Sequence, residues 1–437
     1  MSRLFLILCF GAACAAQPLP LSMKQAVDLA LAPAGNARWR LAQEAAAQAR
    51  ARQGQARAAL LPNIDASIAA QDFTRNLRAF GVRFDLPVPG FALKEVVGPF
   101  AFTDLRAAAS QTVFDFSALR RYQASKAARS AAEAGRESAR NQVTELVARA
   151  YLAALRAEAA VETARANVKL AEALARLAQS QKAAGTGTGI EITRAEVQLA
   201  NERQRLLIAA NDEERTRLQL VKAIGLKLDA EISLTDSLDY RVVEDVAAGE
   251  AVRLGQAQRM DLEAQRRREQ SARLNYSSVK LERIPSVIAM ADAGGIGLAG
   301  ESLRATRTYG ATLRIPLWDG GRRDERRAEA LAELRAEQVR SEDMTKQVEL
   351  EIRLAIDFER SAAEQTKVSE EGLRLAENEL AQAQRRYEAG VATGLEVTDA
   401  QTRLARAREN RIAALFNHNL ARVELASAMG AVHKIIQ

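Results

Sequence analysis

Residues that bind metal ions or form disulfide bonds are nearly absent from this chain. Its 437 residues include only two His and two Cys, and both Cys lie within the first fourteen positions, at Cys9 and Cys14. The rest of the sequence therefore offers no His/Cys metal cluster, no disulfide framework and no thiol nucleophile. His418 and His433 lie in the final helical region with no cluster of acids and bases around them. We accordingly expect no metal, no cofactor and no enzymatic activity.

Aromatic residues and a strong charge of one sign are also missing. Aromatics make up 5% of the chain, while Ala, Arg, Glu, Gln and Leu dominate, a mixture typical of long helices. The 62 basic and 55 acidic side chains leave a formal charge of +7, and the two signs are interleaved. This pattern indicates solvated helix faces. It lacks the clustered basic patch of a nucleic-acid-binding protein, so we expect no nucleic-acid partner.

Long apolar runs are absent as well, and no segment reaches the roughly 18 apolar residues of a membrane helix. The N-terminus resembles an export signal, with Arg3, an apolar stretch that ends at Phe10, and then small residues. We therefore predict a signal peptide at 1–16, cleaved after one of its last two alanines. Alternatively, the segment from Gly11 resembles a lipoprotein box in which Cys14 would be lipidated.

Proline is confined to positions 18–99, 285 and 316. Because an interior proline costs a helix about 3 kcal/mol, the two proline-free stretches that remain favour very long helices. Glycine-rich segments at 185–189 and 390–394 interrupt them and predict two helical hairpins. We expect Asp115 or Ser117 to cap the first long helix and Asp319 to cap the second.

The two hairpins are copies of one unit. The segment Lys182–Ala195 lies over Tyr387–Ala400 at an offset of 205 residues, and the same offset places Ala223–Gly225 on Ala428–Gly430. Landmarks that stay in register over so long a span indicate an internal repeat.

Period-two alternation ahead of each long helix predicts strands at about 63–72 and 308–315. We expect partner strands at 103–113 and 286–292, joined by loops at 72–102 and 293–305. Strands of this length suit a tilted crossing of a membrane, where unpaired edges are costly. Four strands cannot close a barrel, whereas three copies of the chain would supply twelve. The alternative is a soluble β-hairpin that carries long helices.

The duplicated order of strand pair, long helix, glycine turn and returning helix resembles the TolC-type outer membrane efflux family. The most telling residues are Tyr387–Gly390, followed by Leu395–Ala400. The resemblance implies an α+β membrane protein and a homotrimer. Its four strands per chain would form a 12-stranded β-barrel in outer membrane lipid, continuous with a long α-helical barrel in the periplasm of a Gram-negative-type envelope.

The predicted plan has five parts. They are the signal peptide at 1–16; a first repeat at 17–225, with its hairpin at 118–225; an equatorial segment at 226–260; a second repeat at 261–430, with its hairpin at 320–429; and a C-terminal tail at 431–437.

The resemblance also implies a pore entrance at the hairpin tips. Glu396 and Asp399 match positions where the family places carboxylates that face the pore, and Glu191 is their first-repeat equivalent. A ring of such carboxylates attracts cations. Tyr387 matches a tyrosine that ties neighbouring coils closed, but Ala392 stands where the family often has an arginine. The plainer interpretation is that acidic residues suit a helix N-terminus.

The tip glycines would contact a periplasmic adaptor protein, although they also serve as ordinary helix-ending turns. These residues are Gly185, Gly189, Gly390 and Gly394. The function implied is the outer membrane channel of a tripartite efflux or type I secretion system. It would be a passive exit duct that an adaptor and an inner-membrane pump, of RND or ABC type, open at the periplasmic tip. The alternative is a periplasmic coiled-coil adaptor or a structural protein without a channel.

Overall fold

The computed structural model describes residues 19–81, 94–242 and 247–432. The predicted signal peptide, Cys14, His433 and most of the tail at 431–437 lie outside these residues. Within them, no helix combines the length and apolar character needed to cross a membrane. The chain forms two compact units. One comprises Met1–Ala45, Glu133–Ala264 and Glu342–Gln437, and the other comprises Ala46–Ala132 and Gln265–Ser341.

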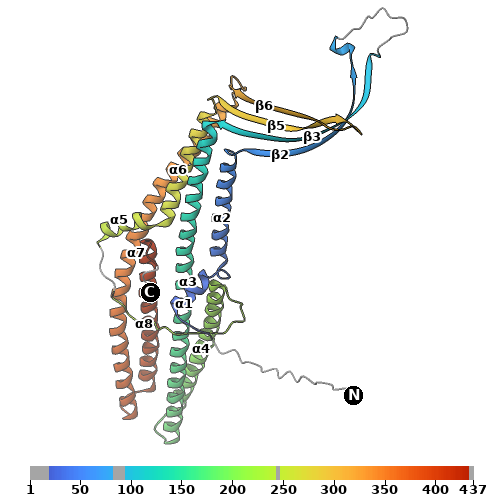
Figure 1. The fold of residues 1–437 in the computed structure, drawn as a ribbon. Coiled ribbons are helices and arrows are strands. Elements are labelled where there is room, and N and C mark those ends of the chain that lie inside the picture. Colours follow the sequence, from blue (N-terminus) through green and yellow to red (C-terminus); the bar gives the residue numbers. More distant parts are fainter. Residues whose placement is uncertain (1–18, 82–93, 243–246, 433–437) are drawn as a thin grey trace, which may run out of the picture. The chain divides into compact units, whose positions relative to one another are not determined.

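The second unit is built on a four-stranded antiparallel sheet in the order β2-β3-β5-β6 (Figure 1). Its strands are β2 (Asn63–Asn76), β3 (Val96–Phe114), β5 (Ser286–Leu298) and β6 (Arg304–Arg314). A short 3-10 helix, η1 (Arg78–Phe80), follows β2. The strands predicted from alternation at 63–72 and 308–315 correspond to β2 and β6, and the partners expected at 103–113 and 286–292 correspond to β3 and β5. Each observed strand extends beyond its predicted bounds, β3 and β5 the most.

The extension of β5 corrects the loop expected at 293–305. The register pairs Gly294 with Arg106 of β3, and a Cβ atom at Gly294 would lie 2.1 Å from the carbonyl oxygen of Leu105. Only glycine allows the two backbones to approach so closely, so this glycine belongs to a strand. The connection between β5 and β6 is therefore shorter than expected.

Helices join this sheet, in the same unit, at the end where β2 and β5 begin and β3 and β6 end. They are the last part of α2 (Ala37–Ala58), the first part of α3 (Phe116–Ala183), most of α6 (Met260–Leu281) and the first part of α7 (Arg322–Glu388). Asp115 caps α3, because its Oδ1 accepts from the backbone N–H groups of Ser117 and Ala118 at 2.8 and 3.1 Å. Asp319 does not cap α7 in this way. It pairs with Arg323 at 3.2 Å.

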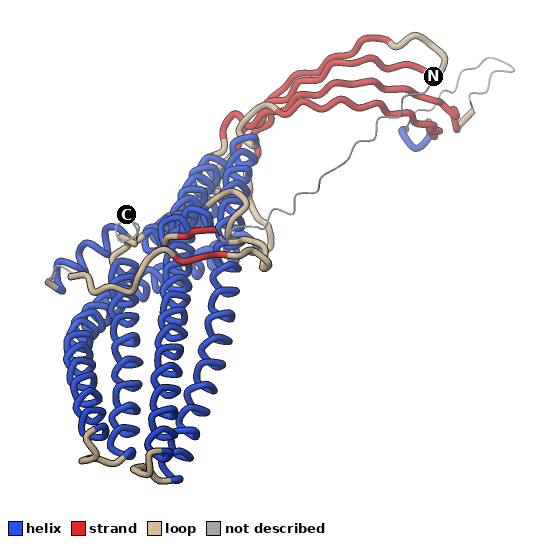
Figure 2. The backbone as a smooth tube through the Cα atoms, turned by 90° about the horizontal axis from the view of Figure 1, so that it is seen from below, coloured by secondary structure: helices blue, strands red, loops and turns tan. Residues whose placement is uncertain are grey.

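The first unit contains both hairpins. The remainder of α3 returns through α4 (Gly189–Ile224), and the remainder of α7 returns through α8 (Gly394–Ala428). Figure 2 shows the four helices side by side, with both turns at the same end. The repeat predicted from the sequence thus appears as two structurally equivalent hairpins.

Smaller elements surround the opposite end of these helices. They are β1 (Leu19–Leu21), which pairs in parallel with β4 (Ile232–Leu234), α1 (Met23–Leu31) and α5 (Ala248–Gln258). The buried Tyr151 hydroxyl donates to the carbonyl oxygen of Leu21 at 2.8 Å, which fastens β1 to α3. An apolar cluster of buried side chains lies near the turns and includes Leu380, Tyr387 and Val397.

Candidate functional site at the hairpin tips

The two turns have the same backbone design. Gly185 and Gly390 follow the ends of α3 and α7 with φ angles of +80° and +73°, in the left-handed region that favours glycine. Behind Gly390, the N–H of Val391 returns to the carbonyl oxygen of Arg386 at 3.0 Å. Gly189 and Gly394 have a different role, because each is the first residue of the returning helix. The four predicted tip glycines therefore divide into two that turn the chain and two that begin helices.

Glu191 ties the first tip to the second. Its Oε2 accepts from the backbone N–H of Thr188 at 2.9 Å, which closes the first turn of α4. Its Oε1 lies 3.5 Å from the backbone nitrogen of Gly394, at the start of α8. The N–H of Thr188 is the main cause that holds the pKa of the Glu191 carboxyl below its ordinary value. The charged form of Glu191 is thus the one that joins the two hairpins.

Tyr387 closes the same contact from the second hairpin. Its side chain is 7% exposed and packs within the apolar cluster formed by α7 and α8. Burial, followed by the negative charge of Glu191, raises the pKa of its hydroxyl. A Cβ atom at Gly394 would lie 3.5 Å from Cγ of Glu191 and 3.7 Å from the Tyr387 hydroxyl. Gly394 therefore lies at the contact between the two hairpins, although a Cβ atom there would meet its neighbours at ordinary contact distances.

Glu396 and Asp399 are exposed, in contrast to Glu191. Glu396 pairs with Arg386 of α7, with 3.2 Å between Oε1 and Nε, and 43% of its side chain remains accessible. Ala392, which replaces the expected arginine, packs against the apolar cluster. A basic partner is nevertheless present in Arg386. The sequence analysis missed it because Arg386 lies in α7, ahead of the turn that contains Ala392. The feature of the sequence that could have identified Arg386 is that it directly precedes Tyr387.

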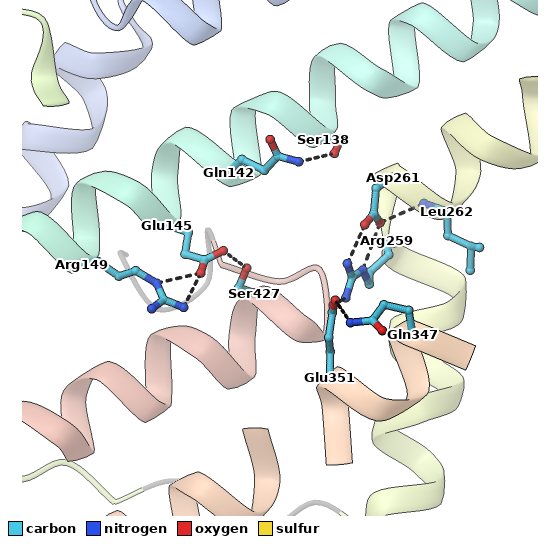
Figure 3. Close-up of polar contacts among 10 residues, drawn as sticks. All are labelled: Ser138, Gln142, Glu145, Arg149, Arg259, Asp261, Leu262, Gln347, Glu351 and Ser427. Atoms are coloured by element: carbon cyan, nitrogen blue, oxygen red, sulfur yellow. Dashed lines mark hydrogen bonds and ion pairs between the residues drawn. The ribbon is translucent and has the colours of Figure 1, made fainter. Parts of the chain in front are cut away.

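A second polar cluster, which sequence reasoning did not find, lies at the junction of α5 and α6 in the first unit (Figure 3). Arg259 interrupts the two helices and is 15% exposed. It pairs with Asp261 at 2.6 Å and also with Glu351 of α7. Burial opposes ionisation of Asp261, but the hydrogen bonds and charge of Arg259 outweigh it and lower the pKa of that carboxyl. The cluster is a joint that holds α7 against the break between α5 and α6.

Glycines bring the helices of this joint together. A Cβ atom at Gly255 would lie 2.4 Å from Cδ1 of Ile352, so α5 lies directly on α7. Gly430, with φ of +74°, follows α8 and approaches the backbone of Gln258 at 3.1 Å. A cavity of about 660 Å³ lies beside the joint. The charged residues of the joint line it, together with charged residues of α3 and α8. No group of three or more potential metal ligands occurs in the part of the chain that the structure describes.

Comparison with known proteins gives the same family over most of the chain. Residues 31–226 and 252–431 match the family model described as outer membrane efflux protein. No curated protein matches the chain.

Solved structures share the fold at low identity. The outer membrane protein VceC of Vibrio cholerae has a TM-score of 0.80 at 20% identity, over 93% of this chain and 96% of that one. The CmeC outer membrane channel of Campylobacter jejuni has a TM-score of 0.82 at 17% identity, over 94% and 86% of the two chains. The open-state MtrE outer membrane channel of Neisseria gonorrhoeae has a TM-score of 0.78 at 18% identity, over 94% and 89%.

Proposed function

Because this chain belongs to the outer membrane efflux protein family, we propose that it is the passive exit duct of a tripartite efflux system, opened at its hairpin tips by partner proteins. The chain has the family's fold. Three copies contribute four strands each to a 12-stranded β-barrel in the outer membrane, and the long helices form an α-helical barrel in the periplasm. The finer proposal concerns how the periplasmic end is closed and what opens it.

The observation that carries the proposal is the contact between the two tips. Glu191 of the first hairpin reaches the backbone nitrogen of Gly394 in the second, beside the buried Tyr387. For the helical barrel to widen at this end, the hairpins have to move relative to one another, and this contact opposes that movement. Glu191 and Tyr387 thus act as the closing contact of the gate.

Glu396 and Asp399 have a different role in this proposal, because both remain exposed. Two carboxylates from each of three chains would surround the entrance and draw cations toward it. Arg386 offsets part of the charge of Glu396. Glu191, engaged between the tips, does not belong to this ring, so the ring holds fewer carboxylates than the sequence suggested.

Gly185 and Gly390 are the glycines best placed to meet a periplasmic adaptor. Open space surrounds the position of a Cβ atom at each of them, so a partner backbone can come close. Gly189 faces the amine of Lys182, and Gly394 faces Glu191 and Tyr387. We therefore assign adaptor contact to the two turn glycines. The inner-membrane pump, of RND or ABC type, would act through this adaptor.

The test is single-channel conductance of the purified protein in planar bilayers. We expect the wild type to show small, cation-selective openings. The conductance should be larger in Glu191→Gln, and the cation selectivity should be lower in the double variant Glu396→Ala/Asp399→Ala. The control is Glu370→Ala/Glu377→Ala, which removes the same charge from exposed positions on α7 away from the tip. If the control changes selectivity as much as the tip variant does, the entrance is not at these carboxylates. If Glu191→Gln conducts no more than wild type, the proposed closing contact is wrong.

A further inference from the structure

The two faces of the sheet in the second unit differ in character along most of its height. One row of the register joins Ile64, Ala109, Ala291 and Tyr309 on a single face. The side chains of Ile64 and Tyr309 are 73% and 83% exposed, and Ile68 on the same face is 76% exposed. Large apolar groups this exposed suit contact with lipid. This face is therefore the outer face of the barrel.

The opposite face carries charge. Arg106 pairs there with Asp292 at 2.6 Å and with Asp104 at 3.2 Å. The missing side chain of Gly294, its partner in the register, leaves room for the guanidinium to lie across the sheet. Charges are costly on a lipid-facing surface, by about 2–4 kcal/mol for a basic residue at the midplane. Arg307 lies on the other face at this level, but the three charged side chains that pair here make this face the one that lines the lumen.

The lumen face changes character beyond this charged band. Phe73 pairs with Phe100 in the register, and alternation places Phe102 on the same face as Asp104 and Arg106. The ring centroid of Phe73 lies 6.0 Å from that of Phe100 and 5.9 Å from that of Phe102. These three rings are packed together at the end of the sheet where β2 and β3 continue past β5 and β6 toward η1 (Figure 1).

The reverse of the sheet at this level is small or polar. The positions there are Ala70, Asp72, Ala101 and Thr103. Apolar side chains at this end thus gather on the lumen side and not on the outer side, contrary to what contact with lipid would favour. The outer surface here suits water, and the aromatic cluster is left facing the duct.

We propose that Phe73, Phe100 and Phe102 form an aromatic collar at the outer mouth of the duct, which contacts cargo that bears aromatic or apolar groups. This inference rests on the proposed function and adds the class of cargo. Twelve strands about 4.8 Å apart, tilted by about 40°, enclose a barrel of roughly 12 Å radius at the Cα atoms. Three clusters of rings project into that space. The guanidinium of Arg75, 5.0 Å from the centroid of Phe73, shows that the cluster can hold a cation against a ring face.

The first test asks which way the collar faces and does not depend on conduction. Phe102→Cys and Leu105→Cys lie on opposite faces of β3. Whole cells that carry each variant are treated with a membrane-impermeant maleimide, and wild type gives the background. We expect Phe102→Cys to be labelled and Leu105→Cys to be protected by lipid. Labelling of Leu105→Cys alone overturns the assignment of the faces and with it the collar, whatever the fate of the gate at the tips.

The second test measures what the collar contacts. Tetraphenylphosphonium, an aromatic cation, is added to the outer side of planar bilayers, with tetraethylammonium as the cation without rings. We expect block by tetraphenylphosphonium that weakens roughly tenfold in Phe73→Ala/Phe100→Ala/Phe102→Ala. Phe73→Leu/Phe100→Leu/Phe102→Leu keeps apolar side chains but removes the rings, and we expect it to lose most of the block as well. Phe114→Ala, at the other end of β3, is the control. If block is unchanged in both triple variants although Phe102→Cys is labelled, the collar proposal is wrong. The proposed function as an exit duct is not affected by this result.

Discussion

At the scale of single residues, Glu191 combines a local and a long-range role. Its position, three residues after Thr188, is that of an acid that stabilises the first turn of a helix, which the plainer interpretation of the sequence anticipated. The same carboxylate also contacts the backbone at the start of α8. This second contact could not be predicted from the sequence, because the order of residues does not show that the two turns lie side by side.

Acidification should therefore loosen the tips. The pKa of Glu191 is depressed in the folded chain, so its contribution to the closed form is present above the ordinary pKa of a glutamate. This contribution is lost as pH falls through the depressed value. We expect wild-type conductance to rise on acidification below about pH 4. Glu191→Gln should already conduct more at neutral pH and should change little on acidification.

A second variant separates the effect of Glu191 from that of the exposed acids at the tips. Glu396→Ala/Asp399→Ala retains Glu191 and should keep the rise at low pH. If this rise disappears with Glu396 and Asp399, and persists in Glu191→Gln, the pH dependence belongs to the exposed ring and not to the closing contact.

The tip glycines offer a matched pair of substitutions. Gly390 has a positive φ, so Gly390→Ala should cost roughly 1–2 kcal/mol and loosen the second turn. Gly394 does not share this conformation, and a Cβ atom there meets its neighbours at ordinary contact distances of 3.5 Å or more. Gly394→Ala should thus be nearly neutral. Limited proteolysis of the tips compares the two variants, and equal protease sensitivity would contradict this distinction.

At the scale of whole elements, the sequence was most informative where one physical constraint acts over a long stretch. The absence of proline indicated α3 and α7, and alternation indicated β2 and β6, whereas β3 and β5 were expected only as their partners. The ends of β3 and β5 were harder to predict, because Gly294 and Gly295 have the composition of a loop. Their place in β5 follows from the close approach of Leu105, which only the folded sheet reveals. The joint at Arg259 was missed for a similar reason, since Glu351 lies 92 positions away.

That joint should matter to stability. Arg259→Ala would leave Asp261 and Glu351 partly buried without their cation, and we expect a loss of about 2 kcal/mol, below the cost of a fully buried pair because the carboxylates retain some solvent. Arg253→Ala, on the exposed face of α5, is the control and should change stability by less than about 0.5 kcal/mol. Thermal denaturation at one scan rate compares the variants. Equal denaturation temperatures would show that α5 and α6 are held by packing alone.

At the scale of the whole molecule, the lone chain exposes features that make sense only in an assembly. Its sheet has two open edges, β2 and β6, and bears Ile64, Ile68 and Tyr309 on a face that none of the described elements of its own unit covers. Backbone groups left unpaired in lipid cost several kcal/mol each, so the edges have to pair with other copies. The family's trimeric barrel satisfies this requirement. A composition typical of long helices is thus compatible with the proposed membrane protein, because only one face of its four strands would touch lipid.

The orientation of that face can be tested by moving one charge across the sheet. Ile68→Lys would place a cation against lipid, and we expect it to destabilise the inserted barrel by about 2–4 kcal/mol if the residue lies near the midplane. Ser67→Lys is the matched control, because neighbouring residues on a strand point to opposite faces and this side chain would enter the lumen. The amount of folded trimer recovered from outer membranes is the readout. Loss of trimer in Ser67→Lys with normal assembly of Ile68→Lys would reverse the two faces, and the charge pairs of Arg106 would then have to be buried between chains and not in water.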